Sequence, residues 1–248
     1  MRADGPQGGL YNRPSKLLPN VPGCPHNMNK IRLSFSVFAL ACATAFSASA
    51  DEIKGDAKAG EKKISPCIGC HGIDGYQASF PEVYKVPKIA GQGAKYIVSA
   101  LTAYKKGDRK HPSMRGIAAG LSDQDIADVA AYYEVLGRVD NAPALGKAAD
   151  GTATAAELVK KGACVSCHGD NFSKPVDPSY PKIAGQHADY LFVALKAYKT
   201  EGNPTWGRGN PIMGGVAKQF SVAELKELAK YVSSLPGELK TVPQNRFK

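Results

Sequence analysis

The sequence predicts an all-α protein made of two tandem domains that are related by an internal duplication. Two repeated segments and one pattern predict this arrangement. The segment Cys67 to His71 (CIGCH) returns as Cys164 to His168 (CVSCH), and Pro87 to Gln92 (PKIAGQ) returns unchanged as Pro181 to Gln186. Apolar residues elsewhere recur at helical spacing, and no stretch alternates as a strand would. With about 90 residues, each half is long enough for one small core.

The repeated CxxCH segment has the spacing of a covalent haem attachment motif. On a helix, residues at i, i+3 and i+4 share a face, so two thiols and an imidazole can meet one flat macrocycle from the same side. Each thiol would add across one haem vinyl group, and the imidazole would bind the iron. The motifs therefore predict two covalently bound haem c groups, one held by Cys67 and Cys70 with His71 on the iron, the other by Cys164 and Cys167 with His168.

Three other interpretations of the cysteine pairs remain open at this point. A CxxC segment can be a thioredoxin-like dithiol, four Cys and two His could hold zinc, and cysteines of an exported protein can form disulfides. The histidine that follows the second cysteine directly in both copies favours haem.

The first 50 residues are expected to precede the folded protein. Residues 1–27 are rich in Gly, Pro and Asn without an apolar period, and we interpret them as an extension from a mis-called upstream start. Residues 28–50 combine a basic start, the uncharged run Leu33 to Ala48 and the small residues Ala48-Ser49-Ala50 before Asp51. This pattern predicts a cleaved signal peptide and export to the periplasm.

Two alternatives concern the same apolar run. It could stay uncleaved as a membrane anchor, although Ser and Ala dilute its hydrophobicity. Cys42 could be a lipidation site, although the residues before it fit such a signal poorly.

The charge of the mature chain is modest. The full chain carries 32 Lys and Arg against 22 Asp and Glu. Removing residues 1–50 takes away five basic residues and one acidic residue, which leaves a net charge of +6. It also removes two of the six cysteines, so every remaining one belongs to a CxxCH motif. This charge argues against nucleic acid as a partner and suits weak steering toward acidic protein surfaces.

Each half is predicted to contain three main helices. The first leads into the CxxCH motif, and in the second half Thr154 and Glu157 suggest a capping box at its start. The middle helix spans about 94–106 and stops at Gly107, and its copy stops near Gly202. The last helix begins at a capping serine in each half, at Ser122 with Asp125 and at Ser221 with Glu224.

The helices and the turn-forming residues between them give the domain limits. A stretch from Gly137 to Gly151 is rich in turn-forming residues and reads as the connection between the halves. We therefore expect a first domain over 51–140, a linker over 141–153 and a second domain over 154–248.

Met114 and Met213 are the candidate iron ligands on the far side of each haem. They lie in matching contexts, one per half, in what reads as a Gly- and Pro-containing loop before the last helix. A single Met is more often a core filler. A matched pair favours iron ligation, because a thioether is a known axial ligand of c-type haems.

The other histidines and the only tryptophan do not follow the duplication. His111 aligns with Asn210 and His187 with Gly93, so both are expected at the surface or behind a ligand. His111 is nevertheless close enough to Met114 in sequence to act as a substitute ligand. Trp206 is expected to pack near the second haem.

The tandem CxxCH motifs, the repeated PKIAGQ loops and the late methionines together resemble the cytochrome c4 family, dihaem class I cytochromes c of the bacterial periplasm. The resemblance covers essentially residues 51–240. It implies two all-α cytochrome c folds related by an approximate two-fold axis, with the haems facing across the interface. It also implies that a carbonyl from the Pro87 and Pro181 loops orients each proximal imidazole.

The function that the resemblance implies is electron transport without catalysis. Members carry electrons from a quinol-oxidising complex or another periplasmic donor to a terminal oxidase, often in loose association with the membrane. Two alternatives are a cytochrome subunit of a periplasmic dehydrogenase, such as a sulfide-oxidising flavoprotein, and a dihaem peroxidase. The peroxidase would need one iron with an open or removable ligand, against which the paired methionines count.

Overall fold

The computed structural model describes residues 53–138 and 152–244, which belong to one compact unit, Ala50–Lys248. The expected N-terminal extension (1–27) and signal peptide (28–50) lie outside the described residues, as does most of the expected linker (141–153). Within the described ranges, every helix is too short or too polar to cross a membrane.

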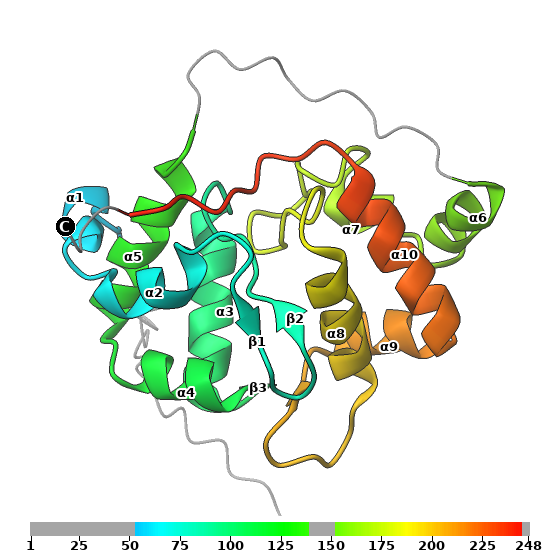
Figure 1. The fold of residues 1–248 in the computed structure, drawn as a ribbon, viewed down its shortest axis with the longest axis horizontal. Coiled ribbons are helices and arrows are strands. Elements are labelled where there is room, and N and C mark those ends of the chain that lie inside the picture. The colour runs from blue at the N-terminus through cyan, green and yellow to red at the C-terminus, as the bar shows by residue number, and fades with distance from the viewer. Residues whose placement is uncertain (1–52, 139–151, 245–248) are drawn as a thin grey trace, which may run out of the picture. The chain divides into compact units, whose positions relative to one another are not determined.

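The first half is built around two long helices, α3 and α5 (Figure 1). α5 packs against both α1 and α3, and α3 also packs against α4. The elements of this half are α1 (Ala57–Glu61), α2 (Ser65–His71), β1 (Gln77–Ala78), β2 (Tyr84–Lys85), α3 (Ala94–Lys106), β3 (Arg109–Lys110), α4 (Pro112–Ala119) and α5 (Asp123–Val135).

The second half repeats this plan with α8 and α10 as its long helices. α8 packs against α9 and α10, and α10 also packs against α6. The elements are α6 (Ala153–Lys161), α7 (Val165–His168), α8 (Ala188–Lys199), β4 (Gly207–Arg208), α9 (Pro211–Lys218) and α10 (Val222–Ser234). The described residues are therefore helix-rich with only two-residue strands, which confirms the all-α prediction.

The capping serines start the last helix of each half as predicted. Ser122 Oγ accepts from Asp125 N at 3.1 Å, and Asp125 Oδ2 accepts from Ser122 N at 3.0 Å. Ser221 and Glu224 form the same reciprocal box at the start of α10. The middle helix α3 also ends as predicted, at Gly107 with a φ of +86°.

Two predicted helix ends were wrong. α6 begins at Ala153 because Thr152, not Thr154, caps it: Thr152 Oγ1 accepts from Ala155 N at 3.1 Å. Ala155, in the first turn of this helix, is only 1% exposed. α8 ends at Lys199, where Thr200 takes an extended conformation, rather than near Gly202.

The cores lie between the long helices of each half. The first core is formed by α3, α5 and the segment around α2, with Ile64, Ile97, Leu101 and Ile126 among its buried residues. The second half has two adjoining clusters, one around Leu191 and Val232 and another around Leu158, Phe220, Leu225 and Leu228.

Several contacts join the two halves. β3 of the first half pairs antiparallel with β4 of the second, with Arg109 opposite Arg208. The segment after α10 returns to the first half, where Lys240 N donates to Ala90 O at 3.0 Å and Val242 packs against the first core (Figure 1).

A buried carboxylate, Asp128 on α5, ties the start of the first half to its core. Its side chain accepts from Asp56 N at 2.8 Å and from Lys63 Nζ at 2.6 Å, and only 4% of it is exposed. The bond to Lys63 is the main reason why the pKa of Asp128 lies below its ordinary value.

We expect Asp128→Asn to lower the free energy of unfolding at pH 7, because it removes the charge that Lys63 neutralises. A carboxyl whose pKa is lowered by folding stabilises above its unfolded pKa, about 3.9, and this stabilisation is lost as the pH falls further. The difference between wild type and variant should therefore stay constant from pH 7 to 5 and shrink below about pH 4.

Urea denaturation of the haem-loaded protein at several pH values would measure this difference. Asp123→Asn is the matched control, because Asp123 is also paired with a lysine but its side chain is 75% exposed. An equal loss in both variants, or a difference that grows in acid, would contradict the assignment.

Candidate haem sites

The first CxxCH motif lies on a helix, as predicted. Cys67, Cys70 and His71 all belong to α2, so the two sulfurs and the imidazole share one helical face. In the second half α7 is shorter, but Cys164 at its N-cap has helical backbone angles, φ −58° and ψ −39°, and so continues the same face. All four motif cysteines are free thiols.

The chemistry of the thiols argues against a reactive dithiol. Burial raises the pKa of Cys67 to about 11 and is also the main cause that raises the pKa of Cys164. A redox-active CxxC pair needs a lowered thiol pKa, because the thiolate is the nucleophile. Among the described residues, no three Cys, His, Asp or Glu side chains converge as a metal-binding group.

Both motif histidines are held by a proline carbonyl from the repeated loop. His71 Nδ1 lies 2.9 Å from Pro87 O, and His168 Nδ1 lies 3.1 Å from Pro181 O. A carbonyl oxygen only accepts, so Nδ1 must carry the proton and donate it. Nε2 is then left with a free lone pair for a metal, which confirms the expected orientation.

Burial keeps both imidazoles neutral. It is the main cause that lowers the pKa of His71 and of His168, and it outweighs the proline carbonyls, which act in the opposite direction. His168 is only 8% exposed. A neutral imidazole with a fixed tautomer is the form that binds iron.

Met114 and Met213 lie on helices, so their placement in loops was wrong. They occupy the first turns of α4 and α9, which begin at Pro112 and Pro211. Proline suits the first helical position, because its missing N–H has no partner there in any case and its φ is already helical. The proline that favours a helix start was therefore present before the methionine in both copies of the sequence.

His111 and Asn210 perform the same task at the starts of these helices. Asn210 Oδ1 accepts from Met213 N at 2.9 Å, and His111 Nδ1 accepts from Met114 N at 3.4 Å. His111 Nε2 is engaged as well, at 3.0 Å from Tyr84 Oη. Both ring nitrogens of His111 are thus engaged, and one of them would have to be freed before His111 could replace Met114 as a ligand.

The donor set in the first half fits a haem. Cys67 and Met114 pack against the same buried cluster, together with Ile89 and Val98. In the second half Cys164 packs against the cluster around Phe172 and Leu191. Thiols for attachment, an oriented imidazole, a thioether and an apolar wall suit a covalently bound haem.

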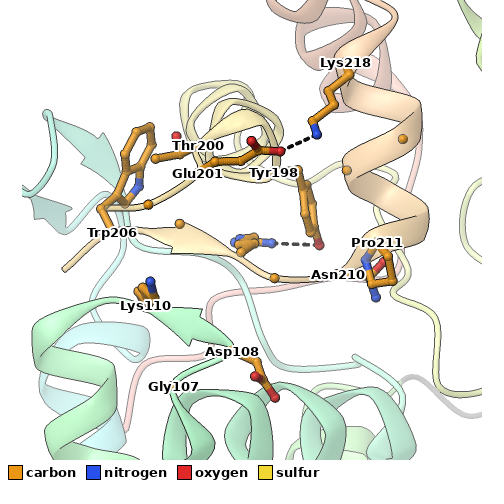
Figure 2. Close-up of a pocket in the computed structure, with 16 residues that line it drawn as sticks. Gly107, Asp108, Lys110, Tyr198, Thr200, Glu201, Trp206, Asn210, Pro211 and Lys218 are labelled. Atoms are coloured by element: carbon orange, nitrogen blue, oxygen red, sulfur yellow. Dashed lines mark hydrogen bonds and ion pairs between the residues drawn. The ribbon is translucent and has the colours of Figure 1, made fainter. Parts of the chain in front are cut away.

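A cavity opens beside the start of α9, where Asn210, Pro211 and Gly214, the neighbours of Met213, form part of its lining. It measures about 620 Å³ and is lined by none of the eight predicted haem-binding residues. Figure 2 shows Trp206, Tyr198 and Asp108 around it and the ion pair between Glu201 and Lys218 at its edge. Trp206 therefore lies at this cavity, and its place relative to the second haem stays a prediction.

The region where the two halves contact each other, called the junction below, has two features that were not predicted from the sequence. Gln92 and Gln186 are each 4% exposed and bond across the halves. Arg109 and Arg208 both reach the hydroxyl of Tyr190, at 2.8 and 3.0 Å. The arginines have the same offset as the methionines, 99 residues, so the duplication itself could have drawn attention to them.

Comparison with known proteins gives consistent results. The family model "Cytochrome c" matches twice, over residues 57–136 and 152–236. Cytochrome c4 of Stutzerimonas stutzeri is 35% identical over 195 residues, which cover 73% of this chain and 90% of that protein. The thiosulfate dehydrogenase electron acceptor of Stutzerimonas stutzeri (strain A1501) is 34% identical over 178 residues, covering 68% of this chain and 78% of that one.

Among solved structures, reduced recombinant cytochrome c4 from Pseudomonas stutzeri superposes with a TM-score of 0.53 at 32% identity. The superposition covers 73% of this chain and all of that one.

We expect Asn210→Ala to lower the free energy of unfolding by about 1 kcal/mol, the usual cost of losing an N-cap. It should also loosen the first turn of α9, so that added imidazole displaces Met213 from the loaded protein more readily. Asn210→His is the matched variant, because His111 caps α4 in the same way, and it should avoid most of this loss of stability. Urea denaturation and an imidazole titration followed by absorbance measure both effects. Equal losses in the two variants would rule out the cap as the cause.

Proposed function

The chain belongs to the cytochrome c4 family of electron carriers, and on that premise we propose that it passes single electrons between redox partners in the periplasm. The donor is a quinol-oxidising complex or another periplasmic protein, and the acceptor is a terminal oxidase or reductase. The relatives support the carrier role, and the predicted signal peptide over 28–50 supports the location.

The observation that carries this function is the pairing of a carbonyl-bound histidine with a capped methionine in both halves. In our proposal His71 and Met114 bind one iron, and His168 and Met213 bind the other. Each haem, when bound, supplies a one-electron ferric–ferrous couple.

The chain's own residues serve to keep each iron site closed and rigid. Pro87 O and Pro181 O hold the Nδ1 protons and fix both imidazole planes. The N-caps His111 and Asn210 fix the turns that carry the methionines. An iron site with protein ligands on both sides and a packed apolar wall excludes water and changes little on reduction, which suits rapid electron transfer.

A second candidate function is service as the dedicated electron acceptor of a periplasmic dehydrogenase. The thiosulfate dehydrogenase electron acceptor found among the relatives favours this function. A sulfide-oxidising flavoprotein is another dehydrogenase that could be the partner, because the sequence is compatible with it as well. The same iron ligands would serve this role. The two functions differ in partner alone, so co-purification with a dehydrogenase would favour the second.

Carbon monoxide binding to the reduced, haem-loaded protein tests the ligand assignment. We expect two haems per chain and no spectral change with the gas at neutral pH, because both irons are closed. Met114→Ala should open one iron and bind one equivalent of gas, which provides the positive control. Ready binding by the wild type would overturn the carrier assignment and favour a peroxidase or sensor.

Export has its own test. We expect the protein recovered from a periplasmic fraction to begin at Asp51, after Ala48-Ser49-Ala50. N-terminal sequencing or intact mass measures this directly. A chain recovered in the membrane fraction with residues 28–50 attached would show that the segment stays as an anchor.

A further inference from the structure

The peptide bond that orients each proximal histidine is bonded a second time by the opposite half of the molecule. Pro87 O accepts from His71, and the N–H of the same peptide, Lys88 N, donates to Gln186 Oε1 at 3.0 Å. The second half repeats the arrangement. Pro181 O accepts from His168, and Lys182 N donates to Gln92 Oε1 at 3.0 Å.

Each glutamine side chain forms hydrogen bonds to the opposite loop through both its amide oxygen and its amide nitrogen. Gln186 Nε2 donates to Lys88 O and Gln92 Nε2 donates to Lys182 O, both at 2.9 Å. Each Oε1 also accepts from the next backbone N–H of its own loop, at 3.0 Å in both halves. Because both glutamines are only 4% exposed, their amide groups are shielded from water and depend on these bonds.

The repeated PKIAGQ sequence makes this geometry possible. Gly91 and Gly185 have φ angles of +80° and +68°, the left-handed region that favours glycine. These turns bring the following glutamine to the junction while the proline of the same loop stays at the histidine. Each loop therefore contacts the histidine of its own half, and it also contacts the peptide whose carbonyl accepts from the histidine of the other half.

Hydrogen bonds in series through a peptide strengthen one another. A bond at the Lys88 N–H polarises the Pro87 carbonyl and makes it a better acceptor for the proton on His71 Nδ1. A better acceptor raises the basicity of the imidazole as a metal ligand. A more basic ligand stabilises ferric over ferrous iron and so lowers the reduction potential.

We propose that Gln186 and Gln92 are positioning residues that tune the proximal histidine of the opposite half, Gln186 acting on His71 and Gln92 on His168. This inference rests on the proposed function, because it takes both histidines as iron ligands. It makes the potential of each haem depend on closure of the junction between the halves. Opening the junction breaks both bonds and raises both potentials.

The test uses Gln186→Met and Gln92→Met, which keep the length and shape of the side chain and remove its amide. In the loaded protein, Gln186→Met should raise the potential of the first haem more than that of the second, and Gln92→Met should do the reverse. Redox titration gives the potentials, and the NMR signals of the two axial methionine methyl groups assign each one to its haem. A shift confined to the haem of the variant's own half, or no shift, would overturn the proposal.

Backbone hydrogen exchange gives a second readout that does not depend on the iron potential. The Lys88 amide should exchange faster in Gln186→Met, and the Lys182 amide faster in Gln92→Met. Tyr190→Phe is the control for a loosened junction, because it removes the hydrogen bonds from Arg109 and Arg208 without changing charge and without touching either peptide. This variant should leave the Lys88 and Lys182 amides protected from exchange. It should not shift the potential of one haem more than that of the other in the way expected of the glutamine variants.

Different results would contradict the proposed function and the role of the two glutamines. A chain that carries no haem, or whose spectrum lacks histidine–methionine ligation, would defeat the proposed function. Two haems with normal ligation, unchanged potentials and unchanged amide exchange would defeat only the role of the glutamines.

Discussion

The hydrogen bond from each proximal imidazole to a proline carbonyl is the constraint on which the rest of the site depends. It selects the tautomer that leaves Nε2 free, and it fixes the direction in which that nitrogen points. The repeated loop has to place its carbonyl within about 3 Å of an imidazole that belongs to the attachment helix. Everything that positions this loop, including the left-handed glycines and the contacts across the junction, therefore acts on the iron ligand.

The sequence was informative where the signal is local. The CxxCH spacing, the capping serines at Ser122 and Ser221, and the stop at Gly107 all depend on residues within one or two helical turns, and the structure agrees with each. Two predictions were wrong, the helix start at Thr154 and the loop placement of Met114 and Met213, because neighbouring residues allow more than one local structure. Thr152 and Thr154 are both good caps, and in the structure Thr152 is the one whose hydroxyl accepts from a helix N–H. Proline at the start of α4 and α9 was read as a loop residue rather than as a first helical position.

What the sequence could not supply is pairing between distant residues. Nothing near Gln92 identifies Lys182 as its partner, because the bond depends on how the two halves meet. Arg109 and Arg208 are a further case, since two cations side by side are unfavourable unless their surroundings compensate. Tyrosine hydroxyls and rings surround them, and the Tyr104 ring lies 4.5 Å from the Arg109 guanidinium. Burial alone would raise the pKa of Tyr190, but the two guanidinium groups lower it to about 8.

The return of the segment after α10 to the first half changes what the internal duplication means for folding. Val242 packs against the first core, Lys240 Nζ donates to Gly137 O at 2.9 Å, and the Tyr132 hydroxyl donates to Gln244 Oε1 at 3.4 Å. The half that is synthesised first is thus completed by residues that are synthesised last. These contacts can form only after the second half has been synthesised, so the packing of the first half is completed after that of its copy has become possible.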